Sequence, residues 1–134
     1  MPIHEGRKRI DITFDNSADT GFFYHLPNKS YLPCQFIFIE CKNYTGEIAN
    51  PELDQMMGRF SNRRGRFGII VCRYLDDNDL FIKRCADTYH DDNGLIIPIV
   101  DEDIITALSE FPQYGVNAIE KILEAKYRKI TFSK

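Results

Sequence analysis

Gln35-Phe-Ile-Phe-Ile-Glu-Cys-Lys42 is an apolar run that ends in two charged residues. Its pattern predicts a strand, and because strand side chains alternate between two faces, Glu40 and Lys42 lie on the same face. They stand roughly 7 Å apart, two strand residues at about 3.3 Å each. Desolvating such ions costs several kcal/mol apiece, against a domain stability of about 5–15 kcal/mol. We therefore expect a function, rather than stability, to explain them.

A second strand is predicted upstream, over residues 7–15, where polar and apolar residues alternate strictly. Its polar face carries Asp11 and Asp15, and pairing beside the Glu40 strand brings Asp11 close enough to Glu40 for both to hold one divalent ion. Asp15 competes for this role. It lies roughly 13 Å from Asp11 along the strand, so the two cannot bind one ion together. We favour Asp11 because it is central in the strand.

A helix is predicted to follow the Glu40 strand, with Asn50 as its cap and Pro51 in its first position. Its apolar stripe recurs at helical spacing and comprises Leu53, Met56, Met57 and Phe60. Its polar stripe comprises Glu52, Gln55, Arg59 and Asn62. Gln55 therefore faces away from the core, yet on a helix that begins just beyond the charged strand.

The remaining elements alternate between helices and apolar strands. We predict a buried central strand over 67–72, a helix over 77–90, and a strand over 95–100 placed at an edge by Pro98. Residues 21–26 are a helix or a strand, with a helix favoured, and the prolines of 27–33 predict a loop. A turn is predicted at 16–21, and helices are predicted at 104–109 and 116–128.

The acidic triplet Asp101-Glu102-Asp103 has three interpretations. It could hold a metal or accept a phosphate, as in receiver domains. Acidic residues are also expected in the first turn of any helix, because they complement the helix dipole. We favour this last interpretation.

Composition predicts a single domain over residues 1–134, with 43% hydrophobic and 28% charged residues. No stretch approaches the ~20 apolar residues of a membrane span, and we expect a cytoplasmic protein without membrane partners. The cysteines Cys34, Cys41, Cys72 and Cys85 lack zinc-site spacing, which favours buried free thiols.

Charge is divided unevenly along the chain, whose net charge is −3. Residues 1–74 hold ten Lys or Arg against eight Asp or Glu, and residues 75–134 hold seven against twelve. The segment from Arg59 to Arg73 contains five arginines and no acid. Four of them, Arg59, Arg63, Arg64 and Arg66, are our candidates for contacts with nucleic-acid phosphates. The alternative is a solvated helix end and turn.

The series Asp11, then Glu40-Cys41-Lys42, then Gln55 resembles the PD-(D/E)XK nucleases, and within them the Mrr-type nuclease domains. The resemblance covers about residues 7–108 and implies an α/β restriction endonuclease-like core, a central mixed β-sheet flanked by helices. Two departures exist. Ile10 stands where the family name implies Pro, and the helix that opens the family core has no counterpart before residue 7. Either that helix is lost or the domain is excised from a longer chain, and we favour the excised domain.

This resemblance implies a metal-dependent endonuclease that hydrolyses phosphodiester bonds of DNA, duplex DNA above all, in restriction or phage defence. Asp11, Glu40 and the backbone carbonyl of Cys41 would bind Mg²⁺ or Mn²⁺, and Lys42 would orient the attacking water. Gln55 would reach the active site or the nucleic-acid backbone. A homodimer and further domains in the parent chain are the expected partners. The alternatives are a catalytically silent nucleic-acid-binding module and a protein-interaction domain with the same fold.

Overall fold

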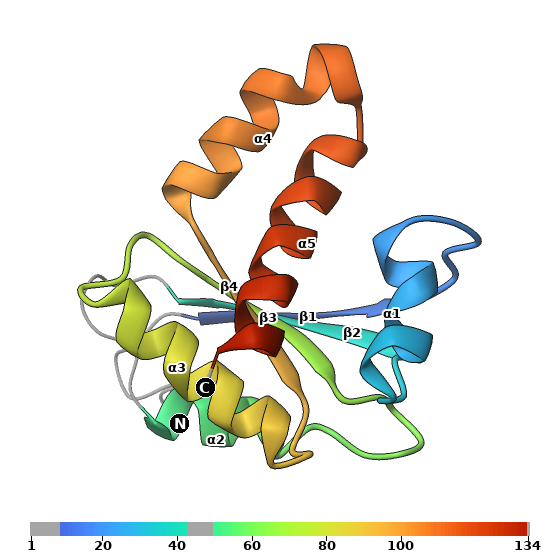
Figure 1. Cartoon of the computed structure of the whole chain (residues 1–134), viewed down its shortest axis with the longest axis vertical. Coiled ribbons are helices and arrows are strands. Elements are labelled where there is room, and N and C mark those ends of the chain that lie inside the picture. The colour runs from blue at the N-terminus through green and yellow to red at the C-terminus, as the bar shows by residue number, and fades with distance from the viewer. Residues whose placement is uncertain (1–8, 43–49, 134) are drawn as a thin grey trace.

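A computed structural model of the chain describes residues 9–42 and 50–133. Four strands and five helices alternate in these residues (Figure 1). In chain order they are β1 (Arg9–Asp15), α1 (Phe22–Ser30), β2 (Phe36–Lys42), α2 (Asn50–Met57), β3 (Phe67–Cys72), α3 (Asn78–His90), β4 (Leu95–Val100), α4 (Asp101–Tyr114) and α5 (Asn117–Phe132). The predicted α/β class is confirmed.

The strands form one mixed sheet in the order β1-β2-β3-β4. β1 pairs antiparallel with β2, whereas β2, β3 and β4 run parallel to one another. The interior position predicted for β3 is confirmed. β4 is an edge strand, as Pro98 predicts, because proline has no N–H to donate to a neighbouring strand.

Helices flank both faces of this sheet. α2 packs so closely on one face that a methyl group at Gly68 would collide with the thioether of Met56. On the opposite face, the Phe22 ring of α1 lies 6.2 Å from the Phe67 ring, and it also contacts Tyr127 of α5. The core therefore has an apolar layer on each side of β2 and β3.

α1 corrects one prediction, since it continues to Ser30 through residues that were expected to form a loop. Pro27 lacks the N–H that would bond the Phe23 carbonyl one turn earlier. The side-chain amide of Asn16 donates to that carbonyl instead, at 3.0 Å. This compensation comes from outside the helix, so the local pattern around Pro27 does not reveal it.

Most other boundaries agree with the predictions. α3 begins where expected, with the Asp77 side chain accepting a hydrogen bond from the Leu80 N–H at 3.0 Å. α4 is longer than the predicted 104–109, because it starts at Asp101 and passes through Pro112, and α5 extends to Phe132. The start of the first predicted strand at residues 7 and 8 and the capping role of Asn50 lie outside the described residues and side chains.

The second half of α5 packs toward α3, whereas α4 and the first half of α5 stand clear of the sheet as a helical hairpin (Figure 1). Among the described residues, no helix is long and apolar enough to cross a membrane. The four cysteines are free, and Cys34, Cys72 and Cys85 are buried as predicted, while Cys41 is half-buried.

Candidate functional site

Asp11 and Glu40 lie directly opposite each other on β1 and β2. Side chains of directly opposed residues share a face of the sheet, with Cβ atoms about 4.5–5.5 Å apart. The sequence alternation in both strands predicts this shared face, and the strand register places the two acids side by side. β1 is an edge strand, so Asp11 remains 36% exposed while Glu40 is fully covered.

Lys42 pairs with Glu40 in the interior. Its Nζ atom lies 2.8 Å from Glu40 Oε2, and the two side chains are 2% and 0% exposed. They meet because residues two apart on a strand project from the same face. Burying both ions costs several kcal/mol each, which their mutual attraction offsets only in part.

Arg59, just after the end of α2, completes the cluster. Its Nη2 atom lies 2.7 Å from Asp11 Oδ2 and 3.1 Å from Glu40 Oε1. Sequence reasoning assigned Arg59 to phosphate binding, whereas the structure places its guanidinium between the two acids. The signal for this was the polar stripe of the predicted helix, on which Arg59 lies one turn after Gln55.

The Arg59 contacts show that both carboxylates converge on one cation position, since a single nitrogen touches an oxygen of each. Two convergent carboxylates suit a hard divalent cation such as Mg²⁺. The donor set therefore fits the metal that the sequence predicts. Among the described residues, no group of three or more His, Cys, Asp or Glu side chains forms a metal site. Further ligands would have to be backbone carbonyls or waters, and the Cys41 carbonyl is the predicted one.

The thiol of Cys41 responds to the same charges. Burial raises its pKa, and the negative charges of Asp11 and Glu40 raise it further. The thiol projects from the opposite face of β2, as alternation requires. The site therefore has its acids on one face and a protonated, unreactive thiol behind them at neutral pH.

Two further polar residues of α2 lie on the stripe that leads to Arg59. Gln55 is exposed, as the sequence predicts. Glu52 is only 9% exposed, which makes it a buried acid that sequence reasoning counted merely as part of the polar stripe and the first helical turn. Burial of an acid is visible only once the helix is placed against its neighbours.

The remaining predicted arginines lie at the other end of the sheet from Lys42. The backbone carbonyl of Arg64 accepts from Phe36 N at 3.0 Å, and Arg66 N donates to the Pro33 carbonyl at 2.7 Å, where β2 begins. β2 spans about 20 Å from this end to Lys42. Arg63 and Arg64 are exposed there. Arg64 Nε donates to the Arg59 carbonyl at 2.9 Å, so Arg59 differs from its neighbours in the direction of its guanidinium, which turns to Asp11 and Glu40.

The other acidic residues considered as metal ligands lie outside the cluster of Asp11 and Glu40. Asp15 pairs opposite Phe36 at the far end of β1 and is exposed. Residues 101–103 form the first turn of α4, and the Asp103 carboxylate accepts from Val100 N at 2.9 Å. This confirms the interpretation of the triplet as a helix start.

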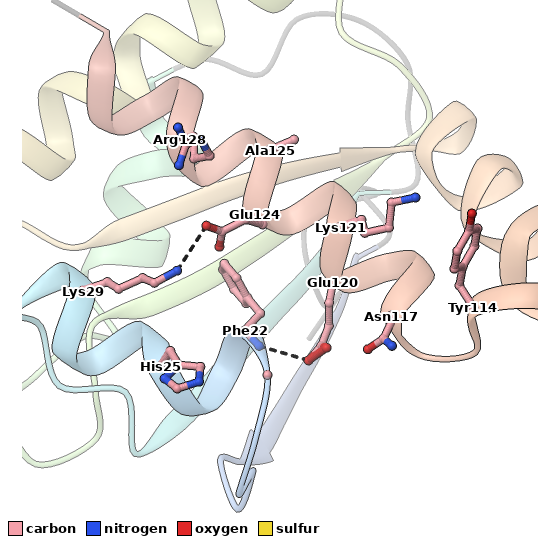
Figure 2. A pocket seen from close by; sticks show the side chains of 11 residues that line it. Phe22, His25, Lys29, Tyr114, Asn117, Glu120, Lys121, Glu124, Ala125 and Arg128 are labelled. Atoms are coloured by element: carbon pink, nitrogen blue, oxygen red, sulfur yellow. Dashed lines mark hydrogen bonds and ion pairs between the residues drawn. The ribbon is translucent and has the colours of Figure 1, made fainter.

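A separate hollow of about 690 Å³ lies between α1 and α5 (Figure 2). Its two acidic side chains have structural roles. Glu120 accepts from Phe22 N at 3.2 Å, capping α1, and Glu124 pairs with Lys29 at 3.2 Å. These contacts join α1 to α5, so the two acids of the hollow already have a structural role. We therefore place the candidate active site at Asp11, Glu40 and Lys42.

Comparison with family models, with curated proteins and with solved structures finds no match for this chain.

Proposed function

We propose that this chain is a Mg²⁺- or Mn²⁺-dependent endodeoxyribonuclease with a restriction endonuclease-like core, acting in the cytoplasm on duplex DNA in restriction or defence. The observation that carries the proposal is the convergence of Asp11 and Glu40 on one cation position, with the Lys42 ammonium 2.8 Å from Glu40. Stability alone gives no reason to bury Glu40 and Lys42 together.

The strand arrangement supports this proposal. An antiparallel pair carries the acids on neighbouring strands, and the strand bearing Glu40 continues through two helix crossovers into parallel neighbours. This is the sequence of elements on which the resemblance to the PD-(D/E)XK nucleases rests. Further domains in a longer parent chain remain part of the proposal.

Asp11, Glu40 and the Cys41 carbonyl would hold the metal. When bound, Mg²⁺ supplies a water of lowered pKa and offsets negative charge that develops on the phosphate. Lys42 orients that water and stabilises the charged transition state through its ammonium group. The side chains of Lys42 and Glu40 are both buried and lie 2.8 Å apart. The Lys42 ammonium is therefore already fixed in place and needs little rearrangement to stabilise the transition state.

Arg59 must move for the metal to enter, because its guanidinium lies between the carboxylates. The side chains of Arg59 and Asp11 are 25% and 36% exposed, whereas Glu40 and Lys42 are covered. The cation position is therefore reached from the Asp11 side. Once displaced toward solvent there, Arg59 is available to a substrate phosphate, as the sequence predicts.

The test is cleavage of plasmid, linear duplex and single-stranded DNA with Mg²⁺, using EDTA as the metal-free control. Asp11→Asn should abolish cleavage, because it removes a metal-binding charge from a partly exposed position with little structural cost. Asp15→Asn is the matched control, since it makes the same change on the same strand and face, and it should cut at the wild-type rate. Equal cleavage by the wild type and Asp11→Asn would overturn the proposed site.

The second candidate function is a binding module without chemistry. Arg59 and Lys42 together neutralise Asp11 and Glu40, so the charges of the cluster balance without a metal ion. The two functions differ in Mn²⁺ titration. If the chain is a nuclease, the wild type binds Mn²⁺ and Asp11→Asn abolishes that binding. If it is a silent module, Asp11→Asn leaves Mn²⁺ binding unchanged.

A further inference from the structure

α4 exposes an apolar stripe that the rest of the described chain does not cover. None of its fourteen residues is buried, and Ile105, Leu108 and Phe111 are 65%, 67% and 55% exposed. Together with Ile104 they lie at helical spacing along one side of the helix. A stripe of this kind normally faces a protein partner.

α5 packs on a different side of α4. The contacts between the two helices include the Asp103 carboxylate with Lys126, and Glu110 with Lys121 at 3.8 Å. Asp103 and Glu110 project about 140° and 160° away from Leu108, at 100° per residue. Among the described residues, α5 therefore pairs with the acidic side of α4 and leaves the apolar stripe exposed.

We propose that this stripe binds the same stripe of a second copy, so that the two α4 helices pair at the centre of the interface with an α5 helix behind each. A two-fold interface must be self-complementary. If two α4 helices cross antiparallel near Leu108, Ile104 and Ile105 face the partner's Phe111, which sets smaller side chains against a large one. The two-fold axis repeats this contact, so both ends of each stripe are covered by the partner.

The area supports a second copy. Five large apolar side chains are 37–69% exposed on this side of α4 and at the hairpin tip: Ile104, Ile105, Leu108, Phe111 and Val116. Together they expose on the order of 500 Å², within the range for the largest patch on a typical monomer. A stable dimer buries about 800 Å² per chain, which this stripe and its polar rim supply.

Charge favours the antiparallel pairing. α4 carries four acidic residues and no Lys or Arg, with three of the acids in its first turn. Antiparallel helices keep the two acidic first turns about 20 Å apart, from the helix rise of about 1.5 Å per residue. A parallel pair or an anionic membrane surface would bring like charges together.

The experiment is sedimentation equilibrium of the whole chain from low to several hundred micromolar. The wild type should form a dimer, and Leu108→Glu and Ile105→Glu should be monomers at every concentration. Gln113→Glu is the matched control, because it adds the same charge on the opposite side of the same helix and should remain dimeric. Thermal unfolding followed by circular dichroism verifies that each variant is folded.

A cross-linking measurement tests the orientation. Leu108→Cys lies at the proposed two-fold axis and should form an intermolecular disulfide on mild oxidation, whereas Gln113→Cys should not. A wild-type chain that is monomeric throughout, a dimer that survives both glutamate substitutions, or a monomer that binds anionic vesicles through α4 would overturn the proposal. These readouts do not involve cleavage, so they are independent of the proposed nuclease activity.

Discussion

The β1–β2 edge of the sheet and the α4–α5 hairpin depart from an ordinary fold in opposite ways. At the sheet, charged Glu40 and Lys42 are buried, whereas on α4 apolar Leu108 is two-thirds exposed. Neither arrangement stabilises the isolated chain: the first desolvates ions and the second leaves apolar surface in water. Both are therefore places to look for function, chemistry in the interior and association on the hairpin.

The largest expected effect separates buried from exposed lysines. Lys42→Met leaves the covered Glu40 carboxylate without its ammonium partner and should destabilise the fold by about 3–5 kcal/mol. Lys121→Met on the hairpin removes an exposed ion pair and should cost about 0–1 kcal/mol. Urea denaturation of both variants, under conditions where the chain is monomeric, measures the difference.

A double variant sharpens this result. Adding Glu40→Gln to Lys42→Met removes the orphaned charge and should recover part of the lost stability. Cleavage should be lost in both variants. Equal, small destabilisation by Lys42→Met and Lys121→Met would contradict the account of a costly buried pair.

The next effect concerns the guanidinium between the acids. Arg59→Ala leaves two carboxylates without their shared cation, so it should increase Mn²⁺ affinity about tenfold, or about 1.4 kcal/mol. Isothermal titration calorimetry gives the affinity, and the metal-free variant should melt at a lower temperature than the wild type. Arg63→Ala is the control, because Arg63 is exposed at the far end of the sheet. If Arg59→Ala bound Mn²⁺ no better than the wild type, Arg59 would not occupy the metal position.

The effect that is smallest at neutral pH concerns three buried thiols, because it develops only as the pH is raised. Burial raises the pKa of Cys34 and Cys72 to about 11, and that of Cys85 to about 12. Unfolded thiols ionise near pH 9, so the folded state holds more protons than the unfolded state above that pH. The stabilisation is thus complete below pH 9 and is lost as the pH rises through 11 to 12.

Thermal unfolding between pH 8 and 11 measures this loss. A triple variant with alanine at all three cysteines should show a shallower alkaline decline, although it is less stable overall. The wild-type thiols should also react slowly with iodoacetamide at pH 8. A decline that is the same in both proteins would assign the alkaline sensitivity to other groups.

Sequence periodicity predicts those features whose causes are local. Alternation in β1 and β2 places Asp11, Glu40 and Lys42 on one face, and Pro98 predicts the edge position of β4. The acidic triplet is correctly interpreted as a helix start. In each case, neighbours within a few residues decide the outcome.

Features that depend on distant partners escape the sequence. The continuation of α1 through Pro27 requires Asn16, and the position of the Arg59 side chain depends on Asp11 and Glu40, 48 and 19 residues away. The burial of Glu52 likewise depends on tertiary packing. A pattern read along one segment contains no information on such contacts.

The most direct test is a crystal structure of the chain grown with Mn²⁺, with the metal located from its anomalous scattering. The account predicts a peak at about 2.0–2.4 Å from carboxylate oxygens of both Asp11 and Glu40, with the Arg59 guanidinium displaced toward solvent. An Arg59 side chain still bridging the two acids at saturating Mn²⁺, with no peak between them, would contradict it.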